Sequence, residues 1–282
     1  ADEERRKKER VNVEKKATAL QLQAARFGAK ASKAAAAHQM VARAEKMLKG
    51  LDDVRQDERV AKLRFPKPAP CGKTPLMASG LSKSYGSLEI FTDVDLAIDR
   101  GSRVVILGLN GAGKTTLLRI LAGVDKPDTG QLEPGHGLKI GYYAQEHENL
   151  DVTRSVLDNM MSAAPDITAT EARKVLGSFL FVGDDVLKPA GVLSGGEKTR
   201  LSLATLVVSS ANMLLLDEPT NNLDPASREE ILGALAHYEG AVVLVSHDEG
   251  AVEALNPERV LILPDGVEDI WGRDYADLIT LA

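Results

Sequence analysis

Residues 108–115 read Gly-Leu-Asn-Gly-Ala-Gly-Lys-Thr, and this stretch decides the fold. The run before it, residues 103–107, is β-branched and apolar, which is typical of a buried strand. The run after it, residues 116–122, carries apolar residues at helical spacing. A strand, a glycine-rich turn and a helix in this order predict a phosphate-binding loop, because the glycines let backbone N–H groups surround phosphate oxygens at a helix N-terminus.

This loop supplies most of the predicted nucleotide contacts. Lys114 is placed to reach the β- and γ-phosphates, and the Thr115 hydroxyl is placed to hold Mg²⁺. The alternative is a glycine-rich turn that binds nothing, and Lys-Thr at this spacing with both flanks correct argues against it. The sequence therefore predicts that the chain binds ATP with Mg²⁺. The residues predicted to bind the nucleotide here are Gly108, Asn110, Gly111, Gly113, Lys114, Thr115 and Thr116.

The composition excludes several classes of protein. The chain has 282 residues, 44% of them hydrophobic, which is enough for a substantial core, and 27% charged. A single cysteine, Cys71, excludes an internal disulfide framework. No apolar run approaches the roughly 18 residues of a membrane span, and the charged N-terminus does not resemble a secretory signal. We therefore expect a cytoplasmic protein without a membrane segment, and the start at Ala1 within a charged helical pattern suggests that an upstream part is missing.

Charge is distributed unevenly along the chain. Residues 1–70 carry 18 Lys/Arg against 10 Asp/Glu, whereas residues 71–282 carry 17 against 31. A basic segment on an acidic body suggests that the segment contacts a polyanion while the body does not.

Residues 1–64 have the composition of helices, with glycine only at 28 and 50 and no proline. Two apolar stripes with steps of three and four residues predict an antiparallel helical hairpin with its tip at Gly28–Ser32. The stripes are Val13, Ala17, Leu20, Ala24 and Phe27, and Met40, Ala44, Met47, Leu51 and Val54.

Basic side chains gather around the proposed tip, and no acidic residue lies between Arg26 and Glu45. One interpretation is a solvated coiled coil that spaces or dimerises; the other is an element that reaches into nucleic acid. Charge alone does not separate them. The residues predicted to contact nucleic acid are Arg26, Lys30, Lys33, Arg43 and Lys46.

The proline-rich stretch Phe65–Pro70 cannot continue a helix, so we expect a linker over residues 1–70 and a second domain over residues 71–282. Within it, strands are predicted at 75–81 and 88–98, joined through Ser84–Gly86 as an antiparallel layer. Further strands are predicted at 138–144, 213–217 and 241–245. Helices are predicted at 151–161 and 170–179 in a helical subdomain of about residues 146–192, and again from the 193–197 motif to about 208 and at 225–238. This alternation predicts an α/β fold with a parallel sheet and helices on both faces.

Polar residues follow the predicted strands where ligands bind in open α/β sheets. Asp217 ends an apolar strand and is expected to hold Mg²⁺ through water, and Glu218 beside it is expected to polarise or position the attacking water. Gln145 could contact both Mg²⁺ and the water, and His247 could contact the γ-phosphate, although a lone histidine is more often structural. Tyr85 offers a flat face for adenine stacking, although a lone tyrosine is usually packing.

The stretch Leu193-Ser-Gly-Gly-Glu197 lies directly before a predicted helix. Two glycines and a serine at that position predict a second anion-binding helix N-terminus. One chain with two such helix ends but a single lysine of the GKT type implies two half-sites, each completed by another domain.

These motifs resemble, in order and spacing, those of an ABC-type ATPase domain. They are similar to its Walker A loop, Q-loop, signature, Walker B strand, D-loop and H-switch, over about residues 71–282. The matching stretches are Gly108–Thr115, Gln145, Leu193–Glu197, Leu215–Thr220, Leu223–Asp224 and His247. The resemblance implies that two such domains sandwich two ATP molecules head to tail, each between one Walker A loop and the other signature. It assigns nucleotide contacts across that interface to Ser194, Gly195, Gly196, Glu197 and Asp224, and it implies ATP hydrolysis that needs a second domain for full activity.

A narrower resemblance is to the ABC-F family, whose chains carry two ATPase domains joined by a basic helical linker. The similar stretches are Arg26–Lys33, Arg64–Pro68, Glu218–Asp224 and Trp271–Leu278, and the departure is Asn222, where the family more often has histidine. The resemblance implies a linker followed by the second ATPase domain, the first being supplied by the missing N-terminal part. It also implies action on the ribosome, in translation or in protection against antibiotics, with the hairpin contacting rRNA and tRNA and with ATP-driven domain closure controlling binding and release.

Two other functions remain open at this point. The ATPase domain alone is compatible with the cytoplasmic energy subunit of an ABC transporter, although a helical hairpin before the first strand argues against it. The other function is a non-catalytic adaptor whose shape is controlled by nucleotide. Glu218, the residue expected to act on water, argues against such an inactive site.

Overall fold

The computed structural model describes residues 41, 65–144, 150–221 and 223–279. Contacts divide the chain into two units, residues 1–61 and residues 62–282. The predicted hairpin and its five basic residues lie outside the described residues, of which only Val41, in a helix, belongs to that region. The hairpin stays a prediction, and the fold below is that of the second unit.

The proline-rich stretch at residues 65–70 packs on the body of this unit. The ring of Phe65 meets the ring of Tyr238 edge-on, with centroids 5.3 Å apart. The buried side chain of Asn212 donates to the carbonyls of Ala69 and Gly137 at 3.2 and 2.8 Å. These contacts make the stretch the first part of the folded body.

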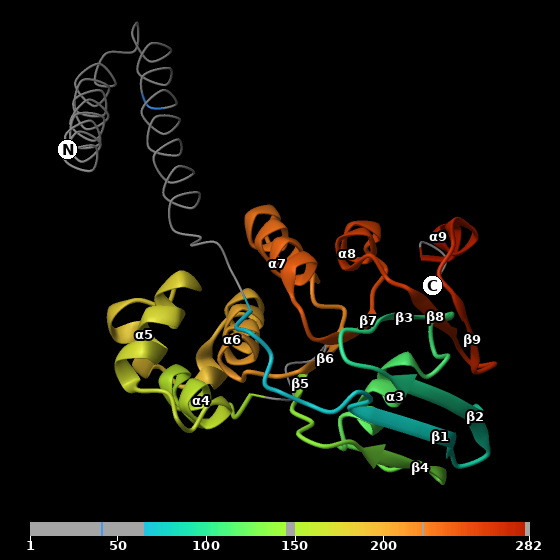
Figure 1. The fold of residues 1–282 in the computed structure, drawn as a ribbon. Helices are drawn as coiled ribbons and strands as arrows, with labels where there is room; N and C mark the ends of the chain where they lie inside the picture. Colours follow the sequence, from blue (N-terminus) through green and yellow to red (C-terminus); the bar gives the residue numbers. More distant parts are fainter. Residues whose placement is uncertain (1–40, 42–64, 145–149, 222, 280–282) are drawn as a thin grey trace, which may run out of the picture. The chain divides into compact units, whose positions relative to one another are not determined.

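A six-stranded sheet forms the centre of this unit (Figure 1), in the order β5-β6-β7-β3-β8-β9. Its first five strands are parallel, and β9 runs antiparallel to β8 at the edge. The strands are β3 (Arg103–Leu107), β5 (Ile140–Tyr143), β6 (Met213–Asp217), β7 (Ala241–Val245), β8 (Arg259–Ile262) and β9 (Val267–Ile270).

The two faces of this sheet belong to two separate cores, because side chains alternate along a strand. Leu214, Leu216 and Leu244 belong to one core, and Leu215 and Val243 to the other. The second core holds α3 (Lys114–Leu121) between this sheet and a three-stranded antiparallel sheet, as Figure 1 shows. That sheet has the order β2-β1-β4, from β1 (Leu76–Tyr85), β2 (Leu88–Ile98) and β4 (Thr129–Pro134).

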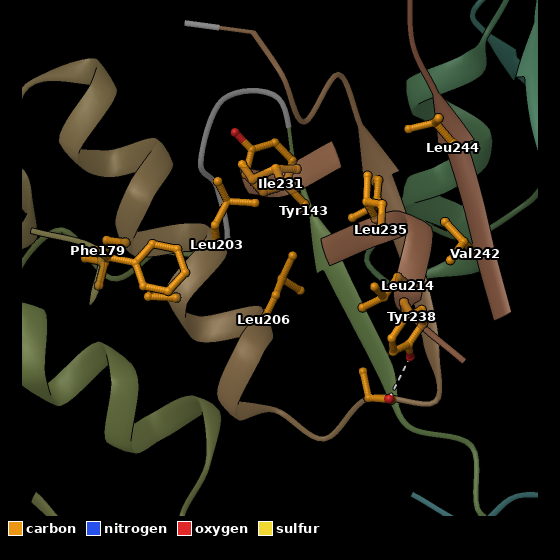
Figure 2. Packing of buried hydrophobic residues seen from close by; sticks show 14 of the residues in the cluster. Tyr143, Phe179, Leu203, Leu206, Leu214, Ile231, Leu235, Tyr238, Val242 and Leu244 are labelled. Carbon is orange, nitrogen blue, oxygen red and sulfur yellow. Dashed lines mark hydrogen bonds between the residues drawn. The ribbon is translucent and has the colours of Figure 1, made fainter. Parts of the chain in front are cut away.

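The first core is covered by helices, and α3 lies on the opposite face of the sheet. This confirms the predicted α/β architecture with helices on both faces. Figure 2 shows side chains of α6 (Gly195–Val208) and α7 (Pro225–His237) directed toward strand residues such as Leu214 and Leu244. The same core includes α4 (Val156–Ala163), α5 (Ala169–Ser178), α8 (Glu249–Leu255) and the end of α9 (Ala276–Ile279), with short 3-10 turns η2 (Gly183–Leu187), η3 (Ala190–Val192) and η4 (Arg273–Tyr275) nearby.

Three predicted elements differ from the structure in their bounds. Tyr85 ends β1 rather than lying in a turn, and the turn is formed by Gly86 and Ser87. The helix predicted from 151 begins at Val156, because Asp151 binds the N–H and hydroxyl of Thr153 and Ser155 caps the helix. The strand predicted over 138–144 is shortened to β5. The sequence predicts no element at β4, β8, β9, α8 or α9.

Candidate functional site

A pocket of about 320 Å³ lies where β3, β6 and β7 end. This is the edge of an open parallel sheet at which ligands bind, and the volume lies at the lower end of the range for small-molecule sites. The pocket brings together residues that lie more than 130 positions apart in the sequence. Its lining residues are Ile90, Asn110, Gly111, Ala112, Gly113, Lys114, Thr115, Thr116, Asp217, Glu218, Asn221, Val245 and His247.

The glycine-rich loop curls because its glycines adopt backbone angles that disfavour side chains. Gly111 has φ +87° and Gly113 has φ +92°. A Cβ at Gly113 would lie 2.3 Å from Cγ2 of Ile90 and 2.9 Å from the ring of Phe91, so only glycine fits there. The loop therefore approaches β2 closely at Gly113.

The N-terminus of α3 differs from those of the other capped helices. Gly113 caps it without a side-chain hydrogen bond, and its first turn holds no acidic residue. Each of α4 to α8 begins at a Ser, Thr or Asp whose side chain accepts from a backbone N–H. No side chain caps the N-terminus of α3, and the dipole of a helix favours an anion at that end.

Lys114 lies inside the loop. Its side chain is largely buried, and Nζ donates to the carbonyls of Gly108 and Leu109 at 2.5 and 3.3 Å. Burial lowers the pKa of Lys114, and the nearby carboxylates of Glu218 and Asp217 partly oppose that change. The amine is therefore held between the loop and the acidic end of β6.

Asp217 ends β6 and is 1% exposed. Its carboxylate is hydrogen-bonded by the Thr115 side chain, and burial raises its pKa. Among the residues that the structure describes, its Oδ2 is buried and has no hydrogen-bond partner. A buried carboxylate oxygen without a partner, next to a threonine hydroxyl, is the kind of donor set that suits Mg²⁺ together with phosphate oxygens and water.

Glu218 is held at the end of β6 by the neighbouring strand. Its backbone has φ +51°, outside the usual region for a non-glycine residue, and its N–H donates to the carbonyl of Val245 at 2.9 Å. Nε2 of His247 lies 3.0 Å from Oε1, and the His247 N–H and the Ser246 hydroxyl reach Oε2 at 3.3 and 3.4 Å. Burial raises the pKa of Glu218, and His247 opposes that change.

The pocket thus gathers most of the predicted phosphate-loop residues together with Asp217, Glu218 and His247. Gly108 contributes its carbonyl to Lys114 instead of lining the pocket. Gln145 and the basic residues Arg26, Lys30, Lys33, Arg43 and Lys46 lie outside the described residues, so their roles stay predictions.

Other predicted residues lie away from this pocket. Tyr85 is half exposed at the end of β1 with Nζ of Lys83 5.4 Å from its ring centroid, and its stacking on adenine stays a prediction. Ser194 and Glu197 bond to each other in a capping box at the start of α6, where Gly195 and Gly196 form the first turn. Asp224 caps α7 by accepting from the N–H of Ser227 at 3.1 Å. Their role as helix caps does not bear on the prediction that they contact a nucleotide bound to a second domain, which stays a prediction.

Sequence reasoning missed some of the lining residues. Ile90 lies on β2 and meets the loop through the close approach at Gly113, a contact that no local pattern announces. Val245 ends β7 beside Glu218, and Asn221 follows the Glu218-Pro-Thr segment. Proximity to the predicted acidic pair was the one signal that could have identified Asn221 and Val245.

The fold is that of an ABC cassette. Residues 91–221 match the family model described as "ABC transporter". The structure is similar to that titled "Dimeric Structure of MJ0796, a Bacterial ABC Transporter Cassette", with a TM-score of 0.60 and 24% identity over 69% of this chain and 98% of that chain. A second similar structure, a post-hydrolysis dimer of the same cassette bound to ADP and Pi, gives a TM-score of 0.58 at 24% identity, covering 69% of this chain and 98% of that one.

Curated relatives extend the comparison. "Putative ATP-binding protein YdiF" of Bacillus subtilis is 40% identical over 78% of this chain and 34% of the relative. "Probable ATP-binding protein YbiT" of Escherichia coli O157:H7 is 36% identical over 95% of this chain and 51% of the relative. "ABC transporter F family member 5" of Arabidopsis thaliana is 34% identical over 76% of this chain and 31% of the relative. The chain thus spans between about a third and a half of the length of these relatives.

Within the described part of the chain, no helix is both long enough and apolar enough to cross a bilayer.

Proposed function

We propose that this chain binds ATP with Mg²⁺ at the pocket below the phosphate loop and hydrolyses it to ADP and phosphate. The observation that carries this proposal is that Lys114, Thr115, Asp217 and Glu218 line one pocket. Phosphoryl transfer to water requires these parts: a phosphate loop, a hydroxyl and a carboxylate that hold Mg²⁺, and a second carboxylate that positions water.

Each part has a defined task in this proposal. The first N–H groups of α3 and the Lys114 amine hold the phosphate oxygens. Thr115 and Asp217 hold Mg²⁺, which neutralises charge on the transferred phosphate when it is bound. Glu218 orients and polarises the attacking water, and its raised pKa makes it a better proton acceptor than a solvated glutamate. His247, 3.0 Å from Glu218, keeps that carboxylate in place.

A second ABC domain completes the site in this proposal. Ser194–Glu197 and Asp224 do not line the pocket of their own chain, although they are accessible at helix starts. The similar MJ0796 structures are titled as dimers. We expect the partner domain to come from the remaining length of the full protein, since relatives are two to three times as long as the matched region.

The ribosome is the proposed site of action. The support is the basic character of residues 1–70, the resemblance to the ABC-F family, and relatives whose names include "ABC transporter F family". A basic helical element suits a phosphate backbone, whose electrostatic attraction dominates binding to nucleic acid. In this proposal the hairpin contacts rRNA and tRNA, and closure of the two domains on ATP controls ribosome binding and release, in translation or in protection against an antibiotic.

The test is co-sedimentation of the full-length protein with ribosomes in the presence of ATP. Glu218→Gln should trap the ATP-bound complex and increase the ribosome-bound fraction, because binding is kept while hydrolysis is lost. Lys114→Ala is the matched control that should prevent trapping, and deletion of residues 15–50 should abolish it. Unchanged sedimentation in all variants contradicts the proposal, and co-purification of a polytopic membrane protein instead would support a transporter subunit.

The need for a second domain has its own measurement. The strictly monomeric chain should turn ATP over slowly, and the full-length protein should turn it over at least about tenfold faster, since donors missing from an active site typically cost 10²–10³-fold. Equal turnover by the two would exclude the shared site while leaving the ATPase proposal intact.

A further inference from the structure

Arg228 and Asp248 form a forked ion pair between α7 and the segment after β7. Nε of Arg228 donates to Oδ2 of Asp248 at 2.7 Å, and Nη2 donates to Oδ1 at 2.5 Å. Two parallel bonds between a planar guanidinium and a carboxylate fix the orientation of both groups, which a single bond does not. The geometry of Asp248 is therefore set from α7.

The same carboxylate holds two further segments. It accepts from the N–H of Gly250 at 2.9 Å and so caps α8. It also accepts a hydrogen bond from the side chain of Thr220, which lies in the segment after β6. One carboxylate thus joins the segment after Glu218, the first turns of α7, and the start of α8.

The backbone of Asp248 connects this junction to the candidate site. Its N–H donates to the Ser246 hydroxyl at 3.1 Å, and that hydroxyl donates to Oε2 of Glu218 at 3.4 Å. His247 lies between Ser246 and Asp248, with its Nε2 facing the other oxygen of Glu218. An unbroken series of hydrogen bonds therefore runs from Arg228 to the carboxylate that is proposed to act on water.

Gly250 leaves the space that the guanidinium occupies. A Cβ built at Gly250 would lie 2.5 Å from Nη2 of Arg228, so a larger residue would displace the fork. Gly250, the second residue of α8, is thus the residue that leaves room for the ion pair.

The pair is partly solvated, with the side chains of Arg228 and Asp248 39% and 19% exposed. A bidentate arginine–carboxylate pair still contributes to stability, so its effect on folding and its effect on positioning have to be separated by experiment. The fork also fixes the distance between α7, which Asp224 caps, and the loop that carries His247.

From this arrangement we propose that Arg228 is a positioning residue for hydrolysis: through Asp248 it fixes His247 and Glu218 relative to α7. This inference rests on the proposed ATPase function. It adds a route by which α7, whose cap Asp224 is expected to face the second domain, controls the carboxylate of Glu218. Arg228 does not line the pocket, so it acts through Asp248 and not on the nucleotide.

The experiment compares Arg228→Met and Arg228→Lys with Arg173→Met in the full-length protein, with ATP turnover and fluorescent ATP binding as readouts. Arg173 is an exposed arginine on α5 and provides the matched control. Arg228→Met should lower kcat about 10- to 100-fold with KM and ATP affinity within about twofold of wild type, as expected when a remote change misplaces a catalytic group. Arg228→Lys should recover part of kcat, and Arg173→Met should match wild type.

A double-mutant cycle with Gly250→Ala separates positioning from a general weakening of the fold. Gly250→Ala displaces the same fork, so it should lower kcat as Arg228→Met does and add little to it in the double variant. Hydrogen exchange of the amides at 248–250, measured without nucleotide, should become faster in both variants. Wild-type kcat in Arg228→Met, or a fall in kcat that is fully additive with Gly250→Ala, overturns the inference while the ATPase proposal stands. If the wild-type protein does not turn ATP over, the ATPase proposal is overturned. If hydrogen exchange at 248–250 is then also unchanged in both variants, the role of the fork is rejected as well.

Discussion

Nε2 of His247 lies 3.0 Å from Oε1 of Glu218, at the ends of the adjacent parallel strands β6 and β7. Glu218 is 4% exposed, and its backbone is in the left-handed region with φ +51°. A buried carboxylate in a strained conformation costs folding free energy. The site thus contains a feature that folding alone does not favour, as the proposed role of Glu218 in hydrolysis would require.

Glu218→Gln should stabilise the nucleotide-free protein at neutral pH. Burial raises the pKa of Glu218, so the folded state holds the proton more tightly than the unfolded state. The free energy of unfolding therefore falls as pH rises from the unfolded pKa, about 4.3, through the raised folded pKa. The neutral amide removes that loss, so we expect a gain on the order of 1 kcal/mol at pH 7.5.

Urea unfolding of both proteins, without ATP and Mg²⁺, measures this gain at pH 7.5 and at pH 4. The difference between the variants should shrink at pH 4, where the unfolded and folded carboxyls are both largely protonated. Glu229→Gln, an exposed position on α7, is the control and should shift neither value. A Glu218→Gln protein that is less stable at pH 7.5 would show that the contacts to His247 and Ser246 outweigh the burial of charge.

Gly113→Ala should be far more disruptive than Gly111→Ala. Both glycines have positive φ, and both substitutions carry a backbone cost of about 1–2 kcal/mol. Only at Gly113 would the new Cβ also meet Ile90 and Phe91, whereas at Gly111 nothing lies within 4 Å. We therefore expect an additional cost of about 1–3 kcal/mol at Gly113, as for other overpacked sites.

Thermal unfolding of the two variants tests this ranking, and fluorescent ATP binding shows whether the loop keeps its shape. Gly111→Ala should fold with a small loss of stability. Equal losses at the two positions would mean that β2 moves away from the loop without cost.

Local patterns were sufficient for the elements that build the site. The run at residues 104–107 is continuously apolar because β3 is buried on both faces, and the Gly113-Lys-Thr sequence fixes the turn into α3. Asp217 could be placed at a strand end for the same reason. These features depend on residues within one strand, turn and helix, which is the range over which sequence patterns report structure.

Features set by distant contacts could not be predicted in this way. The helical composition of 151–161 did not reveal that Asp151 would bind Thr153 and delay the helix to Val156. Tyr85 lies next to a glycine, which suggested a turn, but pairing with Leu88 keeps it in β1. Ile90 joins the pocket only because the antiparallel layer packs against the loop. In each case a side-chain bond or a tertiary contact outweighed the local preference.

Tyr238→Phe should destabilise the domain although it removes a single oxygen. The Tyr238 hydroxyl donates to the carbonyl of Ala211 at 2.7 Å within the buried core, as the dashed line in Figure 2 shows. Removing the donor leaves a buried carbonyl without this bond, which costs about 1–3 kcal/mol. Burial also raises the pKa of Tyr238, so the hydroxyl stays protonated across the whole physiological range.

Tyr275→Phe is the matched control for that substitution. The Tyr275 hydroxyl donates to Oδ2 of Asp269 at 2.5 Å, but this bond lies at the surface, where water can replace it. We expect its loss to cost less than about 0.5 kcal/mol. Equal losses in the free energy of unfolding for the two variants would show that the Ala211 carbonyl finds another donor.

Lys114→Met should separate ATP binding from folding. Burial lowers the pKa of Lys114, so below pH 10.5 the charged amine is held less favourably in the folded state than in the unfolded state. Wild-type stability should therefore rise as pH increases through the lowered pKa toward 10.5, because there the unfolded state binds more protons, and Lys114→Met should lack this rise.

With ATP and Mg²⁺ at about 100 times the dissociation constant, wild type should gain about 2.7 kcal/mol of stability. Lys114→Met should gain almost none of it, because the amine that reaches the phosphates is missing. Thermal unfolding with and without ATP·Mg²⁺ measures both effects on the same samples, and a ligand-induced gain equal to that of wild type would remove Lys114 from the binding site.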